Sequence, residues 1–287
     1  MRLKLLILCG LAFSTQLSAQ TLPRPGDSER GKAPDLASTN PIPAHDSVWI
    51  EDLTWMEVRD AMASGKTTAL IATGGVEQNG PYVVAGKHNL ILRATAAAVA
   101  RKLGNALVAP IIPFVPEGQI DPPSSHMRYP ATISLEEPTY RALLLDIARS
   151  LRAHGFRTII FIGDSRGNQP GMKAVAEELD VAWRSEGTRT IFVPEYYDWD
   201  DRARWLEAHG FNEVEEGFHD ELSVESIILT IDPDAIRLKQ RRAAGHDSIN
   251  GVSLRPPARI ANAGRELVDH IAEITVTAIR NRLGTQP

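Results

Sequence analysis

Two glycine-rich loops carry most of the side chains that could do chemistry in this 287-residue chain. The first, at 74–82, reads GGVEQNGPY and is followed at 86–89 by GKHN, while the second, at 163–169, reads GDSRGNQ. Together they supply carboxylate, imidazole, hydroxyl and amide groups, which a hydrolytic or metal site requires. Neither loop has the spacing of a dinucleotide- or phosphate-binding motif, so nucleotide binding is not indicated.

Each loop follows a short apolar segment that favours a β-strand. Strands are predicted at 67–73, 106–112, 158–162 and 190–193, and helices at 55–63, 89–103, 140–151, 170–183, 223–231 and 258–283. This alternation is typical of βαβ units and predicts a three-layer α/β domain with a mainly parallel sheet flanked by helices. Ligands of such sheets bind beyond the carboxyl ends of the strands, which is where both loops should lie.

Composition and the N-terminal pattern narrow the function classes. The chain is 43% hydrophobic with a formal net charge of −5, which fits a folded protein and not a basic nucleic-acid binder. Its start has the order of a secretory signal peptide: basic at 1–4, apolar at 5–13 and small or polar at 14–19. The apolar segment is too short to span a membrane. We expect cleavage after Ala19, a periplasmic or secreted protein, an extended linker or arm at 20–46, and one domain at 47–287.

Three stretches carry a resemblance to the creatininase family of metal-dependent amidohydrolases. Residues 74–88 (GGVEQNGPYVVAGKH) are similar to the family's GSxEQHGPHLPLxTD segment, 125–134 (SHMRYPATIS) to its Hxx(F/Y)PGTIS stretch, and 161–169 to its NGHGGN turn. His219 precedes an apolar helix, as the family's catalytic histidine does. The resemblance covers about 48–283. It implies a creatininase-like fold, a homo-oligomer, and hydrolysis of a C–N amide bond with a divalent metal of the Zn or Mn class.

The chain departs from the family at most of the metal-ligand positions. The family binds a metal pair through the Glu and His of EQH, the Asp of xTD, the His of NGH and, in some members, a Glu two residues later. Here Glu77 keeps its carboxylate, whereas Asn79, His88, Ser165 and Gly167 stand at the other positions. Asn and Ser are poor ligands for such metals, and a neutral imidazole offers one lone pair where a bridging carboxylate offers two oxygens. We therefore predict a single ion or none.

Within this pattern Glu77, His88 and Asp164 are the predicted metal ligands. Each has a structural alternative as well. Glu77 could accept backbone N–H groups from its own turn, and His88 could cap the helix that begins at 89. Asp164 could close its turn through an Asx hydrogen bond.

Glu77 and His219 are the predicted catalytic residues. A metal-bound water would attack the amide carbon, and His219 would protonate the leaving nitrogen, because the unperturbed pKa of histidine is about 6.5. Alternatively, His219 belongs to a solvated acidic turn. Glu221 and Glu225 are secondary candidates on the same segment, and His126 either contributes to the site or holds backbone.

The substrate-binding groups should come from both loops; the predicted residues are Asn79, Tyr82, Ser165 and Asn168. Ser165 lacks the G-x-S-x-G context of a serine nucleophile, so hydrogen bonding is the favoured role. The predicted function is an exported amidohydrolase acting on a small polar, including cyclic, substrate. The alternative is a binding or scaffolding protein on the same fold that has lost its metal chemistry. The loss of two ligand histidines favours that alternative, and the retained polar side chains oppose it.

Overall fold

The computed structural model describes residues 35–214 and 216–284. The predicted signal peptide and most of the predicted arm lie outside these residues. The chain divides into two compact units, at 1–41 and 42–287. In the described part of the first unit, the Ala37 backbone N–H donates to Asp35 Oδ1 at 2.9 Å. The second unit carries the sheet and the helices.

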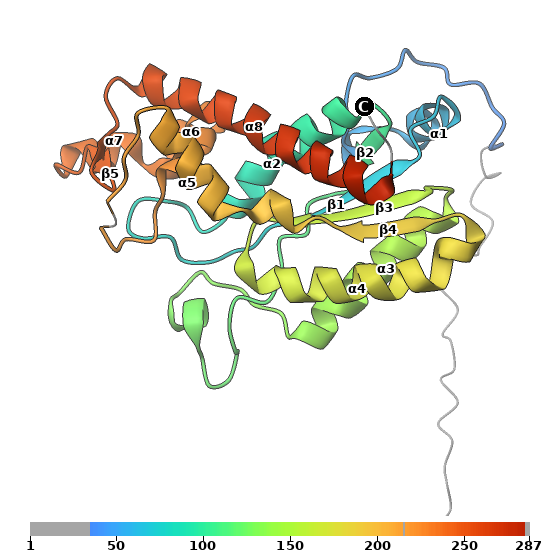
Figure 1. Cartoon of the computed structure of the whole chain (residues 1–287), viewed down its shortest axis with the longest axis horizontal. Helices are drawn as coiled ribbons and strands as arrows, with labels where there is room; N and C mark the ends of the chain where they lie inside the picture. Colours follow the sequence, from blue (N-terminus) through green and yellow to red (C-terminus); the bar gives the residue numbers. More distant parts are fainter. Residues whose placement is uncertain (1–34, 215, 285–287) are drawn as a thin grey trace, which may run out of the picture. The chain divides into compact units, whose positions relative to one another are not determined.

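Four parallel strands form the central sheet in the order β2-β1-β3-β4 (Figure 1). They are β1 (Thr68–Thr73), β2 (Ala106–Val108), β3 (Thr158–Gly163) and β4 (Arg189–Phe192). All six residues of β1 are buried, as expected for a central strand covered on both faces. Strand β2 ends earlier than predicted, at Val108, two residues before Pro110, which has no N–H to donate to a ladder.

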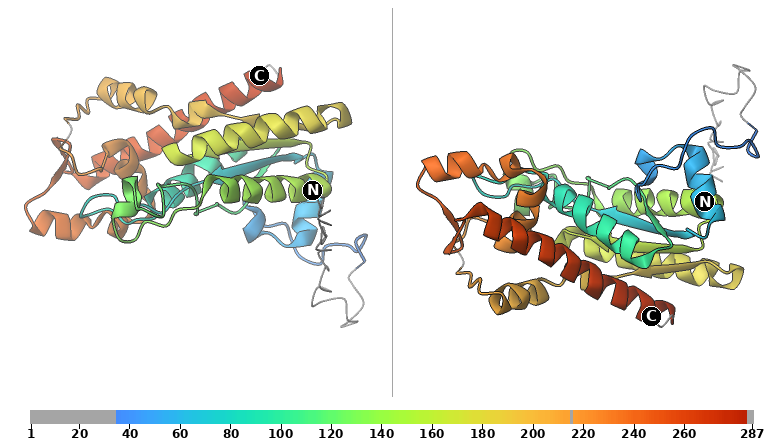
Figure 2. Two further views of the ribbon diagram at one scale, coloured as in Figure 1. Left: turned by 90° about the horizontal axis from the view of Figure 1, so that it is seen from below. Right: turned by 90° about the horizontal axis from the view of Figure 1, so that it is seen from above.

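Helices cover both faces of the sheet, which confirms the predicted three-layer α/β fold. The helices are α1 (Trp55–Ala63), α2 (Lys87–Leu103), α3 (Glu137–Ala153), α4 (Gln169–Trp183), α5 (Trp199–Ala208), α6 (Leu222–Ile231), α7 (Leu238–Ala243) and α8 (Pro257–Leu283). Leu70 and Ile160 face the core under α2, α6 and α8, while Ile71 and Phe161 face α3 and α4. Figure 2 shows α3 and α4 (green to yellow) on one side of the sheet and α2 and α8 (teal and red) on the other. No helix of the described residues is both long and apolar enough to cross a bilayer.

The elements that the sequence did not predict are short or polar. Helix α5 reads WDDRARWLEA and has little apolar periodicity, and α7 has only six residues. A two-stranded antiparallel hairpin, β5 (Ser248–Ile249) and β6 (Val252–Ser253), precedes α8. These elements gain their stability from tertiary contacts, which a local pattern does not record.

The register of the sheet brings the two glycine-rich loops together. Thr73 at the end of β1 lies opposite Gly163 at the end of β3, so the loops leave the same edge side by side. Helix α6, which follows the loop bearing His219, is held against α8 at Gly264. A Cβ at Gly264 would clash with the backbone carbonyl of Ser226 on α6.

We expect Gly264→Ala to destabilise the fold by about 1–3 kcal/mol, because the added methyl meets backbone that cannot yield easily. The sign of the change in unfolding free energy is informative, because a Gly→Ala change in an uncrowded helix interior stabilises the helix by about 1 kcal/mol. Urea unfolding of the variant, with the exposed Glu266→Ala on the same helix as the control, measures the effect. A stabilised Gly264→Ala would contradict the close packing of α6 on α8.

Candidate functional site

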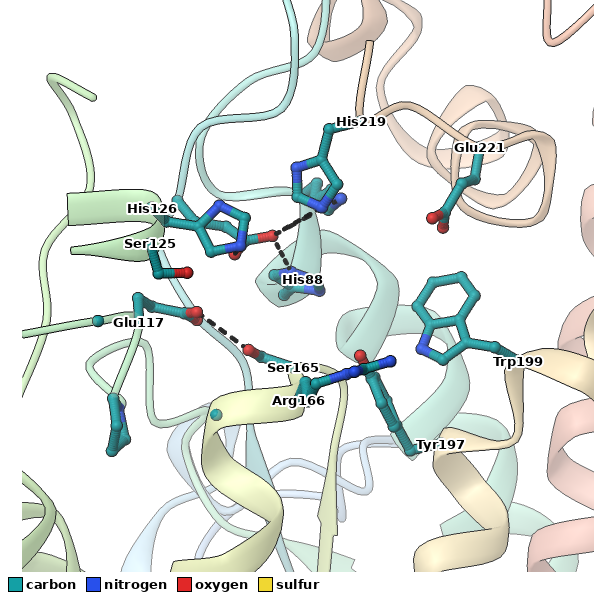
Figure 3. A pocket seen from close by; sticks show the side chains of 15 residues that line it. His88, Glu117, Ser125, His126, Ser165, Arg166, Tyr197, Trp199, His219 and Glu221 are labelled. Atoms are coloured by element: carbon teal, nitrogen blue, oxygen red, sulfur yellow. Dashed lines mark hydrogen bonds and ion pairs between the residues drawn. The ribbon is translucent and has the colours of Figure 1, made fainter. Parts of the chain in front are cut away.

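A cavity of about 560 Å³ lies at the carboxyl ends of β1 and β3 (Figure 3). Its walls come from the loop after β1, the start of α2, the segments at 116–118 and 125–126, the loop after β3, and the chain at 197–221. This is the edge at which the sequence placed the site. The cavity is large enough for a small organic substrate.

Glu77 is the centre of the polar contacts in this cavity. Its Oε1 lies 2.8 Å from His88 Nε2 and 3.7 Å from Lys87 Nζ, and its Oε2 lies 3.2 Å from His126 Nε2. Burial alone would raise the pKa of Glu77, but the hydrogen bond and positive charge of His88, together with Lys87, lower it to about 2. Glu77 is therefore an ionised carboxylate at any physiological pH.

His88 lies between two carboxylates and forms part of the cavity lining. Its Nδ1 lies 2.9 Å from Asp164 Oδ2, whose other oxygen accepts from Arg202 Nη2 at 3.2 Å. Burial alone would lower the pKa of His88, but the hydrogen bonds to Asp164 and Glu77 raise it. Both ring nitrogens of the protonated imidazole donate, so no lone pair remains for a metal. The structure thus uses His88 and Asp164, two of the predicted ligands, as an ion-paired support behind the third, Glu77.

The side chains that the structure brings together as a candidate metal site are Glu77, His126 and His219, whose ligand atoms all lie within 4.8 Å of one another. His126 belongs to the short 3-10 helix Ser125–Arg128, and His219 lies in the loop before α6. The two imidazoles stack with their centroids 4.9 Å apart, and His219 Nε2 lies 3.8 Å from Glu77 Oε1. His219 has a φ of 57°, a left-handed conformation uncommon for a residue with a side chain.

The chemistry of these three donors fits a single divalent cation. The Gln78 carbonyl lies 3.0 Å from His219 Nδ1 and fixes the proton there, which leaves the Nε2 lone pair facing Glu77. Burial lowers the pKa of His126 and of His219, so both rings are neutral near pH 7. His126 Nδ1 is buried without a hydrogen-bond partner among the described residues. Two neutral imidazoles and one carboxylate are ligands that Zn²⁺ and Mn²⁺ accept.

Glu117 is a second acidic group in the cavity, and sequence reasoning missed it. The Ser165 hydroxyl donates to Glu117 Oε2 at 3.1 Å, while Oε1 is buried with no hydrogen-bond partner among the described residues. Burial, with the nearby charge of Glu77, raises the pKa of Glu117 to about 8. Glu117 therefore holds a proton near neutral pH. It lies in an irregular segment with no motif around it, so no sequence signal marked it.

Of the predicted substrate-binding residues, the structure brings only Ser165 to the cavity wall. Asn79 donates through Nδ2 to the carbonyls of Glu77 and Val84, and so braces its own turn. The Asn168 amide likewise donates to the backbone carbonyls at the end of β1. Tyr82 lies outside the cavity lining, and the Arg241 guanidinium carbon is 4.8 Å from its ring centroid. Side chains that complete the wall instead are Lys87, Arg166, Tyr197, Trp199 and Glu221.

The ion pairs of His88 predict a specific pH dependence of stability. The pKa of His88 is raised in the folded protein. The stabilisation that its ion pairs add to the free energy of unfolding is therefore fully present below the unfolded pKa of about 6.5 and is lost as the pH rises through the folded pKa. We expect the difference in unfolding free energy between the metal-free protein and its His88→Gln variant to shrink above about pH 6.5, by at most about 1.4 kcal/mol per pH unit. Denaturant titrations from pH 6 to 9, with the exposed His154→Gln as control, measure it. A difference that grows with pH would contradict the assignment.

Comparison with known proteins agrees with this fold. The family model of creatinine amidohydrolases matches residues 51–279. A creatinine amidohydrolase from Pseudomonas putida is 28% identical over 138 residues, 48% of this chain and 51% of that relative, so the match spans about half of its length. Among solved structures, a manganese creatininase (22% identity, TM-score 0.58) aligns with 84% of this chain and 100% of its own. A Zn–Zn-type creatininase mutant, with 23% identity and a TM-score of 0.56, aligns with 85% of this chain and 100% of its own.

The structural likenesses show the fold, and the family model covers most of the chain. The resemblance seen in the three sequence stretches is therefore confirmed. The chain belongs to the creatininase family.

Proposed function

We propose that the chain is an amidohydrolase of creatininase type that hydrolyses a C–N amide bond of a small polar substrate, cyclic amides included, with one divalent metal ion. The observation that carries the proposal is the convergence of Glu77, His126 and His219 inside the cavity at the carboxyl edge of the sheet. The names of the manganese and Zn–Zn creatininases support a metal of the Zn or Mn class.

Glu77, His126 and His219 would hold the ion. When bound, a divalent ion supplies Lewis acidity, which polarises an amide carbonyl. The chain's own contribution to this step is rigidity, because Glu77 is fixed by His88 and Lys87, and His219 by the Gln78 carbonyl. Preorganised ligands of this kind avoid reorganisation when the charge of the transition state develops.

Glu117 is placed to transfer the proton that amide cleavage requires. Since the Ser165 hydroxyl donates to Oε2, the carboxylic acid proton of Glu117 resides on Oε1, which has no other partner among the described residues. Once water has added to the amide carbon, transfer of this proton to the leaving nitrogen accompanies cleavage of the C–N bond, so that the nitrogen departs as a neutral amine and Glu117 is left as a carboxylate. The sequence assigned this step to His219. We reassign it because His219 has a lowered pKa and its Nδ1 faces the Gln78 carbonyl.

We also propose that the protein is exported and homo-oligomeric. Export rests on the signal-peptide pattern at 1–19. The oligomer rests on the family resemblance. Both proposals are independent of the chemistry of the cavity.

Metal content is the first test of the proposed function. We expect about one divalent ion per subunit in protein purified without chelator, and its loss in Glu77→Gln and in His126→Ala. Glu221→Gln, which changes a cavity carboxylate outside the three donors, is the matched control and should keep the ion. Elemental analysis of the four proteins gives the ratio, and hydrolysis of a panel of linear and cyclic amides follows with the loaded enzyme.

Other outcomes would point elsewhere. Two ions per subunit would mean that further side chains bind a second metal, contrary to the single site proposed. The absence of any ion, together with no hydrolysis of any amide, would favour the binding or scaffolding protein on the same fold.

Glu117→Gln should lower kcat by roughly 10²- to 10⁴-fold, because an amide side chain cannot donate the carboxylic acid proton. The ion should remain, which separates a proton-transfer role from a ligand role. Steady-state kinetics and elemental analysis of the same preparation provide both values, with the exposed Glu178→Gln as control. Unchanged kcat in Glu117→Gln would rule out the proposed role.

A further inference from the structure

We propose that Arg166 is a specificity-determining residue that binds a carboxylate group of the substrate, so that the preferred amides are anionic molecules. The inference rests on the proposed amidohydrolase function for the identity of the reacting bond. It adds the chemical class of the substrate.

Arg166 is a cation of the cavity wall without an internal partner. Among the described residues, none forms a hydrogen bond or an ion pair with its guanidinium, which is exposed. The two largely buried arginines behave differently. Arg202 pairs with Asp164, and Arg241 pairs with Asp220. An arginine left unpaired in a cavity offers its planar set of N–H donors to a ligand, and a carboxylate matches that geometry.

The surroundings of Arg166 favour an anion. Tyr197, beside it on the cavity wall, has its pKa raised to about 12 by burial, so its phenol remains protonated and able to donate. Lys87 also lines the wall, but it is already ion-paired with Glu77, with 3.7 Å between Nζ and Oε1. The cavity acids are Glu77, which is ion-paired with Lys87 and His88, Glu117, which accepts a hydrogen bond from the Ser165 hydroxyl, and Glu221; none of them forms an ion pair with Arg166. Among the described residues, Arg166 is therefore the cation of the cavity wall that has no carboxylate partner and remains available to an anionic ligand.

The position of Arg166 separates the two ends of such a substrate. In Figure 3, Arg166 and Tyr197 lie across the cavity from His126 and His219. A carboxylate held by Arg166 would leave the amide end of the molecule near the metal donors and Glu117. Arg166 also stands at a glycine of the NGHGGN turn that this loop resembles, directly after the lost histidine position at Ser165. The guanidinium is thus a feature that this chain adds to the loop.

The test measures binding, so it does not depend on turnover. Calorimetric titration of the purified protein with N-acetylglycine and succinamate, and with their neutral counterparts N-acetylglycinamide and succinamide, gives a carboxylate-to-neutral affinity ratio. We expect the carboxylates to bind roughly 10- to 100-fold more tightly, as for charged hydrogen bonds. The ratio should fall close to one in Arg166→Gln and recover in part in Arg166→Lys, which keeps the charge without the planar donors.

The exposed Arg149→Gln is the matched control and should keep the ratio of the natural protein. Because the Arg166 guanidinium has no internal partner among the described residues, its variants should fold, and a thermal unfolding curve verifies this. The proposal would be overturned if the preference for the carboxylate ligands persisted in Arg166→Gln or were absent from the natural protein. It would also be overturned if neither carboxylate bound at about 10 mM. Absence of metal and of hydrolysis would defeat the proposed function while leaving the ratio interpretable.

Discussion

A histidine held between two buried carboxylates organises this site. His88 joins Glu77 in the loop after β1 to Asp164 at the end of β3, and Arg202 on α5 completes the chain of charges. Burying such groups costs several kcal/mol per ion unless each is paired, and removal of one partner leaves the others uncompensated. The pairing therefore fixes four separate segments relative to one another. It also sets the orientation of Glu77, on which the candidate metal group depends.

The same arrangement accounts for the way in which the chain departs from its family. A protonated imidazole at position 88 cannot bridge metals, but it can donate a hydrogen bond to Glu77 and to Asp164 at once. Asn79 and Ser165, which stand at the lost histidine positions, have other partners: Asn79 braces its turn and Ser165 donates to Glu117. The side chains at 79, 88 and 165 thus all make polar contacts, although Asn79 Oδ1 is buried without a hydrogen-bond partner among the described residues.

The sequence was informative about the sheet and the edge where the site lies, and much less so about which side chains meet. Apolar segments ending in glycine-rich loops located β1, β3 and the position of Glu77, because these signals are local. The partners of Glu77 are not local. His126 and His219 come from segments distant in sequence, and the resemblance of 125–134 to a family stretch was the one signal for His126. Glu117 had no signal, since its burial and raised pKa arise only from tertiary packing.

The order of the strands places the two glycine-rich loops on opposite sides of one cavity. Because β1 and β3 are adjacent at the centre of the sheet, the loop of Glu77 and the loop of Arg166 face each other across one opening. The first loop, with His126 and His219, collects the neutral and anionic donors that attract a metal. The second loop, with Tyr197, presents a phenol and the Arg166 guanidinium, which has no partner among the described residues. A substrate carboxylate held by Arg166 would leave the amide end of the molecule near the metal donors and the proton on Glu117.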